Sequence, residues 1–419
     1  MTVRYTNFRH RRDSLATTLA YGLVFGLPIA FLYAKFGNVD QRLTMYMPNE
    51  VAVEIFLRLP VKSTLRFRCV CKKWCKFFKH NSDFVSKQLN HSIEKNNFAL
   101  LFTRKGERGV FAIDYDPSSS GSHEVVQIDF PFKDENLEIV GSCNGLLLIK
   151  IDPWLITGLW NPATKEYKLI PRNNITPVGF KTISNRVDRH GFGYDQESND
   201  YKLVTITSPC SQKITVSEVD VYTLSSHSWK RIDHIPYKIM GEPPGVFVNG
   251  ALHWLAKPRP ITSKNKFSQV ILSFNMAKEV FTEIPHLEYF DDGNKFKHKC
   301  IDVLEGYLAM LCSNSKVGFE VWVMNDYGIR ESWTKRYNIS LMKVDFIPSF
   351  WYLRRIHSLK NGEILLEIQL DDKYKYAAMF FYDPKCKRVR AAEVDLGKYD
   401  RRWSKIAGDH LKSRFHTES

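Results

Sequence analysis

The chain has 419 residues, of which 44% are hydrophobic and 13% aromatic, and its formal net charge is +15. This length exceeds that of most single compact domains, so two units or a repeat array are expected. The apolar and aromatic content excludes a disordered chain and favours strands. The positive charge favours an acidic partner, whether a nucleic acid, a membrane surface or an acidic protein.

An uncharged apolar segment, residues 14–34, follows a basic N-terminus. It is as long as the roughly 20 residues of a transmembrane helix. Residues 1–44 therefore form a leader with three interpretations: a membrane anchor, an interfacial helix, or an extension that is not functional because translation begins at Met45 or Met47. A cleaved secretory signal is not favoured, because its apolar part usually has only about 7–15 residues.

Residues 45–90 predict a module of three short helices. Pro48 can begin the first helix and Pro60 can end it. Val51, Ile55, Phe56 and Leu59 are expected on one face of this helix. Leu65, Val70 and Trp74 continue an apolar stripe toward the end of the module near Asn81. Three such helices bury little on their own, so part of the apolar face should belong to a partner.

The segment MPNEVAVEIFLRLPVKSTLRFRCVCKKW, residues 47–74, resembles the F-box of plant F-box proteins, although Met47 replaces the usual leucine. The resemblance implies binding to the Skp adaptor and, through it, to a cullin-RING ligase of the SCF type. The positions that match helix-building or adaptor-facing positions of the motif, and that it therefore implies as adaptor-binding, are Pro48, Val51, Ile55, Leu59, Pro60, Leu65, Val70 and Trp74.

The same module is the most basic part of the chain, since between Val51 and Asn90 only Glu54 and Asp83 oppose its lysines and arginines. A solvated basic face is the simplest interpretation. A DNA-recognition helix would instead expose base-reading side chains. The bulky Trp74 and the two phenylalanines that follow it do not suit that role, so nucleic acid is not the expected partner.

After the module, short β-rich segments repeat. The phrases SCNGLLLI, VNGALHWL, LEGYLAML and LKNGEILL share a glycine, and GFGYDQESNDYKLV fills the gap between the first two. A second phrase contains a turn and then a strand, with turn markers at Asp116, Asn161, Leu224, Asn275, Asn325 and Asp383. Asn, Asp, Pro and Gly at such positions favour hairpins. The spacing predicts six units of about fifty residues, the length of a kelch-type propeller blade.

The phrase NPATKEYKLIP, from Asn161 to Pro171, also resembles the F-box-associated domain of plant F-box proteins. The expected fold is therefore mainly β with a small N-terminal α module: a three-helix F-box at 45–90, then an irregular six-unit β-propeller-like domain at 98–395 that binds the substrate. Residues 396–419 are expected to form a basic C-terminal tail. A pair of β-sandwiches is the alternative architecture.

Sites for chemistry are not evident in the sequence. Cys69, Cys71 and Cys75 lack the paired spacing of a zinc site. The histidines His190, His253, His286 and His298 are scattered, and neither a nucleophile elbow nor a phosphate-binding loop occurs. We therefore expect no catalytic residues, metal or cofactor. Scattered cysteines suit a reducing compartment, the cytoplasm or the nucleus, with membrane association if the leader is an anchor.

These features together predict the substrate-recognition subunit of an SCF-type E3 ubiquitin ligase, which presents a target protein and is not itself an enzyme. Target contacts are expected in the irregular loops 172–190, 257–268 and 286–298, whereas most tryptophans should pack between blades. The alternative is a membrane-anchored, lectin-like or protein-binding propeller with a degenerate F-box. Its N-x-S/T sequons would begin at Asn90, Asn174 and Asn338.

Overall fold

The chain forms two compact units, residues 1–95 with 418–419 and residues 96–417. The computed structural model describes residues 49–59, 64, 66–67, 69–70, 72–81, 83–84, 87–88, 99–102, 109–113, 123–130, 136–152, 156–175, 186–210, 216–240, 244–259, 269–291, 295–314, 317–341, 350–359, 361–370, 377–391, 394–395 and 411–413. The leader at 1–44 lies outside these residues and stays a prediction. Within the described part of the chain, no helix is long and apolar enough to cross a membrane.

The first unit is helical, as expected. It contains the helices α4 (Asn49–Arg58) and α6 (Lys72–His80), with further helical residues at 64 and 66–67 between them and at 83–84 and 87–88 after them. In α4, Glu50 lies in the first turn and Arg58 in the last, where their charges suit the helix dipole. After α6, the side-chain oxygen of Asn81 accepts a hydrogen bond of 2.9 Å from the Phe84 N–H, which caps the next helical segment.

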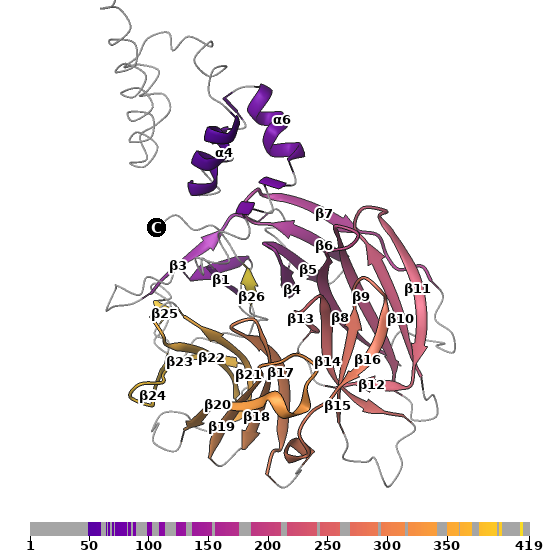
Figure 1. Cartoon of the computed structure of the whole chain (residues 1–419), viewed down its shortest axis with the longest axis vertical. Coiled ribbons are helices and arrows are strands. Elements are labelled where there is room, and N and C mark those ends of the chain that lie inside the picture. Colours follow the sequence, from indigo (N-terminus) through magenta and orange to yellow (C-terminus); the bar gives the residue numbers. More distant parts are fainter. Residues whose placement is uncertain are drawn as a thin grey trace, which may run out of the picture. The chain divides into compact units, whose positions relative to one another are not determined.

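The second unit consists of six β-sheets, here called blades (Figure 1). Blade 1 contains β4 (Asn136–Cys143), β5 (Leu146–Asp152), β6 (Ile156–Asn161) and β7 (Glu166–Ile170). Blade 2 contains β8 (Arg186–Asp195), β9 (Asp200–Pro209), β10 (Ser217–Thr223) and β11 (Ser228–Ile235). Blade 3 contains β12 (Tyr237–Ile239), β13 (Val246–Val248), β14 (Ala251–Pro258), β15 (Val270–Asn275) and β16 (Val280–Ile284).

Blade 4 contains β17 (His298–Leu304), β18 (Tyr307–Asn314), β19 (Gly318–Met324) and β20 (Trp333–Ser340), with the short helices η2 (Glu288–Asp291) before it and η3 (Arg330–Ser332) inside it. Blade 5 contains β21 (Phe350–Ser358), β22 (Ile364–Leu370), β23 (Ala377–Asp383) and β24 (Arg388–Ala391). Blade 6 contains β1 (Ala99–Phe102), β2 (Val110–Ile113), β3 (His123–Ile128), β25 (Val394–Asp395) and β26 (Leu411–Ser413).

Blades 1 to 5 are each built from strands that follow one another in the chain, whereas blade 6 combines strands from both ends of the unit. The predicted propeller-like, mainly β architecture is confirmed. Residues 396–419, however, do not form only a tail, because β26 pairs with β1 through Leu101 and Leu411. Edge strands gain backbone hydrogen bonds by such pairing, which the basic composition of the tail does not reveal.

Five of the six predicted turn markers lie at hairpins, and the sixth, Asp116, lies outside the described residues. Asn161, Asn275 and Asp383 begin the turn between the last two strands of blades 1, 3 and 5. The side-chain oxygen of Asn161 accepts hydrogen bonds from the N–H groups of Ala163 (3.0 Å) and Thr164 (3.2 Å). Asn275 and Asp383 bond the turns after them in the same way. The repeated Asn or Asp therefore marks an Asx turn, which explains its recurrence.

The cores of the second unit lie between blades. Trp254 of β14 is 1% exposed and belongs to a cluster that joins blades 2 and 3. Its ring lies against Gly191 and Gly245, where an added Cβ would come within 2.5 and 2.4 Å of the indole. These glycines let the backbones of two blades approach the tryptophan closely. Blades 2 and 3 are thus joined by this packing and by an isolated backbone bridge between Gly191 and Gly245.

Candidate functional site

The helical module has an aromatic core. Phe56, Phe67 and Phe84 are buried, with 3%, 8% and 2% of their surface exposed. The Phe56 ring lies 5.1 Å from both the Phe67 and the Trp74 rings, centroid to centroid, and meets Trp74 edge to face. Such contacts add to the burial of apolar area. The core of this small module is therefore centred on Phe56.

Helix α4 carries apolar side chains on two sides. Val53 and Leu57 pack against the aromatic core, as Phe56 does. Val51 is 49% exposed, and Ile55, one turn further along, is half-buried but outside that core cluster. We call Val51 and Ile55 the α4 stripe. The stripe offers apolar surface that the module itself does not cover, as the expectation of a partner requires.

The sequence-based assignment of one apolar face to α4 needs a correction. Residues five apart on an α-helix are separated by about 140°, so Val51 and Phe56 cannot share a face. Leu59, Val70 and Trp74 pack partly buried on the aromatic core. Their first role is therefore to hold the module together. Pro48, Pro60 and Leu65 lie outside the described residues, and all eight predicted adaptor contacts stay predictions.

The basic side chains of the module are exposed to solvent. The exposed cations include Arg58, Arg66, Lys72, Lys76 and Lys87. Arg58 and Lys87 form ion pairs with acidic residues one helical turn away, at 3.5 and 2.9 Å. Exposed pairs of this type contribute at most about 1 kcal/mol each. This arrangement is that of the solvated face expected from the sequence.

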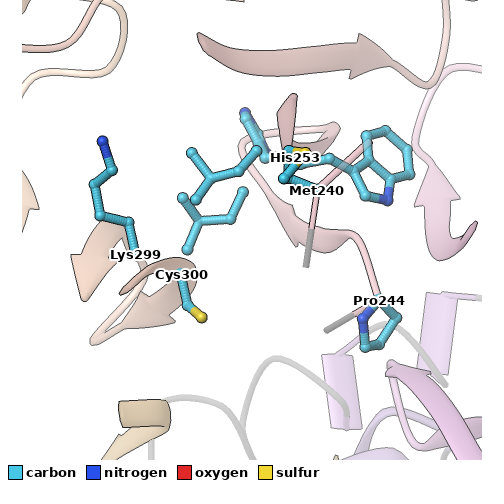
Figure 2. Close-up of a pocket in the computed structure, with 8 residues that line it drawn as sticks. Met240, Pro244, His253, Lys299 and Cys300 are labelled. Carbon is cyan, nitrogen blue, oxygen red and sulfur yellow. The ribbon is translucent and has the colours of Figure 1, made fainter. Parts of the chain in front are cut away.

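The second unit has a small cavity between blades 3 and 4 (Figure 2). Its volume is about 20 Å³, and its lining comes from the region around β12 and β13, from β14, and from β17: Met240, Pro244, His253, Trp254, Leu255, Lys299, Cys300 and Ile301. A space of this size holds about one water molecule. It is too small for a substrate or a cofactor. Nor, within the described ranges, do three His, Cys, Asp or Glu side chains gather around a potential metal site.

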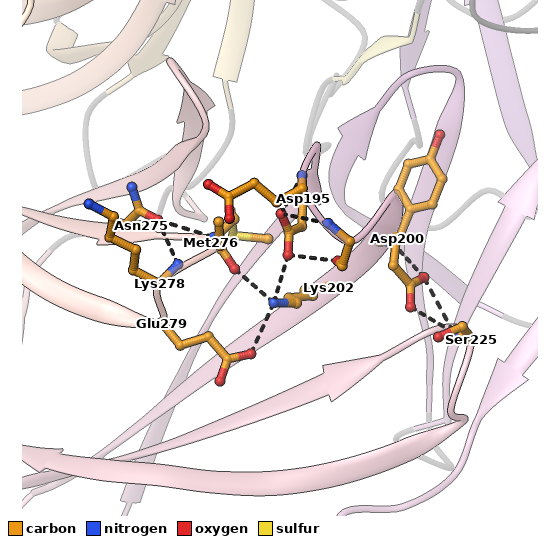
Figure 3. Close-up of polar contacts among 12 residues, drawn as sticks. Asp195, Asp200, Lys202, Ser225, Asn275, Met276, Lys278 and Glu279 are labelled. Atoms are coloured by element: carbon orange, nitrogen blue, oxygen red, sulfur yellow. Dashed lines mark hydrogen bonds and ion pairs between the residues drawn. The ribbon is translucent and has the colours of Figure 1, made fainter. Parts of the chain in front are cut away.

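The most buried ion-pair network of the described residues joins blades 2 and 3 (Figure 3). The Lys202 amino group, 8% exposed, lies 2.9 Å from Asp195 and 3.0 Å from Glu279, and it donates a 2.7 Å hydrogen bond to the Met276 carbonyl. Glu279 also pairs with the exposed Lys230 at 3.2 Å. Every donor direction of the Lys202 ammonium is therefore used.

This network keeps its groups charged. Burial alone would lower the pKa of Lys202, but the hydrogen bonds that its ammonium donates to Asp195 and Glu279 outweigh burial, and the net shift is upward. Burial opposes ionisation of both carboxyls, yet their hydrogen bonds lower the pKa of Asp195 and of Glu279. A catalytic lysine needs the opposite shift, toward a neutral amine. The network therefore holds blades 2 and 3 together through charged groups.

Two further histidines, the buried His253 and the half-buried His190, are also hydrogen-bonded. His253 bonds the Tyr327 hydroxyl through Nε2 at 2.6 Å and the Val246 carbonyl through Nδ1 at 3.3 Å. Burial is the main reason why the pKa of His253 falls to about 4. His190 contacts the Thr205 hydroxyl at 3.1 Å, and burial together with the charge of Lys150 lowers its pKa to about 4. Both imidazoles are therefore neutral at physiological pH.

The tryptophans behave as expected where they are described. Trp160, Trp254 and Trp333 are buried, at 0%, 1% and 4% exposed. The Trp333 N–H reaches from blade 4 to the Pro285 carbonyl at 3.1 Å, and that of Trp229 reaches from blade 2 to the Pro171 carbonyl at 2.8 Å. In both cases a tryptophan at the start of a strand donates a hydrogen bond to the carbonyl of a proline that follows the last strand of the preceding blade. The same hydrogen bond therefore recurs between neighbouring blades.

The predicted target loops share one end of the propeller unit. Strands alternate in direction within each blade, so connections from a second to a third strand, and from one blade to the next, lie opposite the tight hairpins. The predicted loops 172–190 and 286–298 connect blades, and 257–268 connects β14 to β15, the second and third strands in the sheet order β12-β14-β15-β16. Their end residues 186–190, 257–258 and 298 belong to strands rather than loops. In the last of these loops, His286 bonds the Gln269 carbonyl at 2.7 Å and Phe290 is 1% exposed. The described residues 286–291 are therefore held against the blades.

Comparison with known proteins agrees with the two units. An F-box domain family model matches residues 46–86, and a model described as the F-box associated beta propeller domain matches residues 110–406. Solved structures match loosely: a chain of the nidogen/laminin complex covers 75% of this chain, and 98% of its own length matches, with 9% identity and a TM-score of 0.37.

Curated relatives come from Arabidopsis thaliana. The chain is similar to F-box protein CPR1, with 29% identity over 77% of this chain and 79% of the relative. It is also similar to F-box protein At3g07870, with 27% identity over 81% and 85%, and to F-box/kelch-repeat protein At3g23880, with 26% identity over 73% and 82%. The chain therefore belongs to the family of F-box proteins that carry an F-box-associated β-propeller domain.

Proposed function

We propose that this protein is the substrate-recognition subunit of an SCF-type E3 ubiquitin ligase in the cytoplasm or nucleus. The observation that carries the proposal is the α4 stripe: an F-box module exposes Val51 and part of Ile55 while its aromatic core is already filled. A flat apolar stripe beside a complete core suits a Skp adaptor that covers it. The propeller unit then holds the target protein.

The mechanism is proximity. The F-box module is fixed to the ligase through the adaptor, and the propeller unit binds the target, so the target lysines remain near the charged ubiquitin-conjugating enzyme. Tethering raises the effective concentration of the reacting groups without new chemistry. The satisfied states of Lys202, His190 and His253 support a receptor without catalytic residues of its own.

The proposal is tested by the change Val51→Asp. A carboxylate placed in an apolar contact loses hydration, so the free energy of adaptor binding should become less favourable by at least about 2 kcal/mol. The measurement is a calorimetric titration of the full chain with a purified Skp adaptor. The matched control is Val280→Asp, because Val280 of blade 3 is 48% exposed and Val51 is 49% exposed. The control variant should bind as the wild type does.

Adaptor binding by Val51→Asp at wild-type strength would contradict the docking role of the α4 stripe. Absence of binding by the wild-type chain would contradict the ligase function itself. Leu59→Asp also abolishes binding on this proposal, but Leu59 packs on the aromatic core, so that variant loses the fold of the module together with the contact. Val51 is the sharper position for this reason.

A further inference from the structure

Two lysines face each other on neighbouring strands of blade 3. In the antiparallel pairing of β12 with β14, Lys238 lies directly opposite Lys257. Like charges at directly opposed positions destabilise a sheet. Within the described residues, neither of them, nor Lys297 just before β17, forms an ion pair. The described residues therefore supply no counter-charge to these three lysines.

The side of the sheet on which these lysines lie follows from their neighbours. Ile239 and Ala256, the next pair along the two strands, belong to the core between blades 2 and 3. Since side chains alternate along a strand, Lys238 and Lys257 lie on the other side, toward blade 4. Leu255, two residues before Lys257, is in the core between blades 3 and 4, which confirms this side.

Blade 4 adds charge to the same seam. Ile301 of β17 packs in the core that contains Leu255, and Lys299 lies two residues before it on the same side of the strand. Figure 2 shows the Lys299 side chain pointing away from that of Cys300, its neighbour in sequence. The Lys299 amino group donates a 2.6 Å hydrogen bond to the carbonyl of Phe290 in the short helix η2. This bond fixes the amino group at the boundary between blades 3 and 4.

We propose that Lys238, Lys257, Lys297 and Lys299 form a basic seam between blades 3 and 4 that binds an acidic segment of the target protein. This inference rests on the proposed function, because it names the chemistry of the target. The basic seam also lies beside two of the expected target loops, since Lys257 is near the end of β14 and Lys297 directly precedes β17. Carboxylates of the target supply the counter-charge that the described residues do not give to Lys238, Lys257 and Lys297.

A protein segment suits the basic seam better than a single-stranded nucleic acid. Nucleic-acid grooves combine cations with exposed aromatic rings on which bases stack. Two rings on the blade 4 side, Phe290 and Trp333, are buried, at 1% and 4% exposed. Tyr289 already contacts the Lys295 ammonium, which lies 4.1 Å from its ring centroid. The basic seam presents lysine ammonium groups, which bind carboxylates as point charges.

The test uses the full chain without adaptor and a fluorescein-labelled oligo-glutamate peptide, followed by fluorescence anisotropy at several salt concentrations. Lys238→Glu should weaken peptide binding about tenfold and flatten its salt dependence, because it removes one attraction and adds one repulsion. The same variant places opposite charges across the β12–β14 pair, so its Tm should equal or exceed that of the wild type. Loss of binding without loss of stability separates a docking role from a structural one.

Lys278→Glu is the matched control. Lys278 is exposed in the β15–β16 turn, at the opposite end of blade 3, and the substitution changes the net charge equally. The control should bind the peptide within about twofold of the wild type. An equal loss in both variants, or no binding by the wild type, overturns the basic seam. Tighter binding of an oligo-uridylate of equal charge overturns the choice of an acidic protein. Because the adaptor is absent, these results stand apart from the adaptor titration.

Discussion

In the helical module, three buried phenylalanines form one small core, and helix α4 leaves Val51 at 49% exposure. In the propeller unit, separate cores join blades 1 and 2, 2 and 3, 3 and 4, 4 and 5, and 6 and 1. The seam between blades 2 and 3 also contains the buried Lys202 network. A module with one small core has little surplus stability and leaves apolar surface for a partner. A unit with several cores does not need a partner to cover its apolar side chains.

This contrast teaches that the two units respond differently to the same kind of damage. Loss of a central side chain in the module removes its only core. In the propeller unit, the damage falls on one seam among several, as in other repeat architectures where each repeat contacts its neighbours. The predictions below either break this contrast or make it quantitative.

The largest effect is expected for Phe56→Ala. Removal of a buried phenylalanine costs about 3–5 kcal/mol, which approaches the total stability of so small a module. Hydrogen-exchange mass spectrometry should show lost protection for peptides within residues 49–88 and unchanged protection for the propeller blades. Val51→Ala, at an exposed position of the same helix, should leave all protection unchanged. Exposure of the blades in Phe56→Ala would mean that the two units unfold together.

A smaller effect is expected for Lys202→Met. Without the ammonium, Asp195 and Glu279 lose their shared partner, and breaking a buried pair in this way costs about 3 kcal/mol or more. The comparison is Lys165→Met, whose pair with Asp129 is exposed on both sides, at 66% and 55%, and contributes less than about 1 kcal/mol. Denaturant unfolding of both variants measures the difference.

Lys202→Met should also change the acid limit of the propeller unit. The folded-state pKa values of Asp195 and Glu279 lie below their ordinary values of 3.8 and 4.5. Their contribution is therefore present above those values and is lost as the pH falls through the folded pKa values. Without Lys202 this contribution is smaller, so the variant should show a shallower stability loss below about pH 4.5. An unchanged pH profile would contradict the charged state of the network.

The smallest effect is expected for His253→Gln. Burial holds the pKa of His253 at about 4, against an ordinary value of 6.5. Only the unfolded chain takes up this proton between the two values, so wild-type stability should fall as the pH is lowered from 6.5 toward 4. The variant should lose less stability over that window, measured by denaturant unfolding at stepped pH. His190→Gln, at a second pKa of about 4, should act in the same direction.

Local signals were the predictable part of this molecule. The Asx turns were marked in the sequence by Asn161, Asn275 and Asp383, because a short polar side chain that bonds the following backbone is a property of a few adjacent residues. The F-box motif likewise lies within one continuous segment.

Contacts between distant residues were not predictable. Lys202 meets Asp195 from its own hairpin but Glu279 from the next blade, 77 residues later, and no pattern links those positions. The opposed pair Lys238 and Lys257 depends on the register of β12 against β14, which only the fold sets. The sequence spacing placed Val51 and Phe56 on one face of α4. The angle of about 140° between residues five apart on a helix instead puts Phe56 toward the core and Val51 toward solvent.

The order of the blades has a consequence for synthesis on the ribosome. Blades 1 to 5 use consecutive strands, so each has mainly short-range contacts and can form soon after it leaves the exit tunnel. Blade 6 is completed last, because β1 can pair with β26 only after residues 411–413 have been synthesised. Nascent chains therefore spend nearly the whole of translation as an open arc of blades. Chaperones and degradation enzymes that survey new proteins meet this arc before the finished receptor exists.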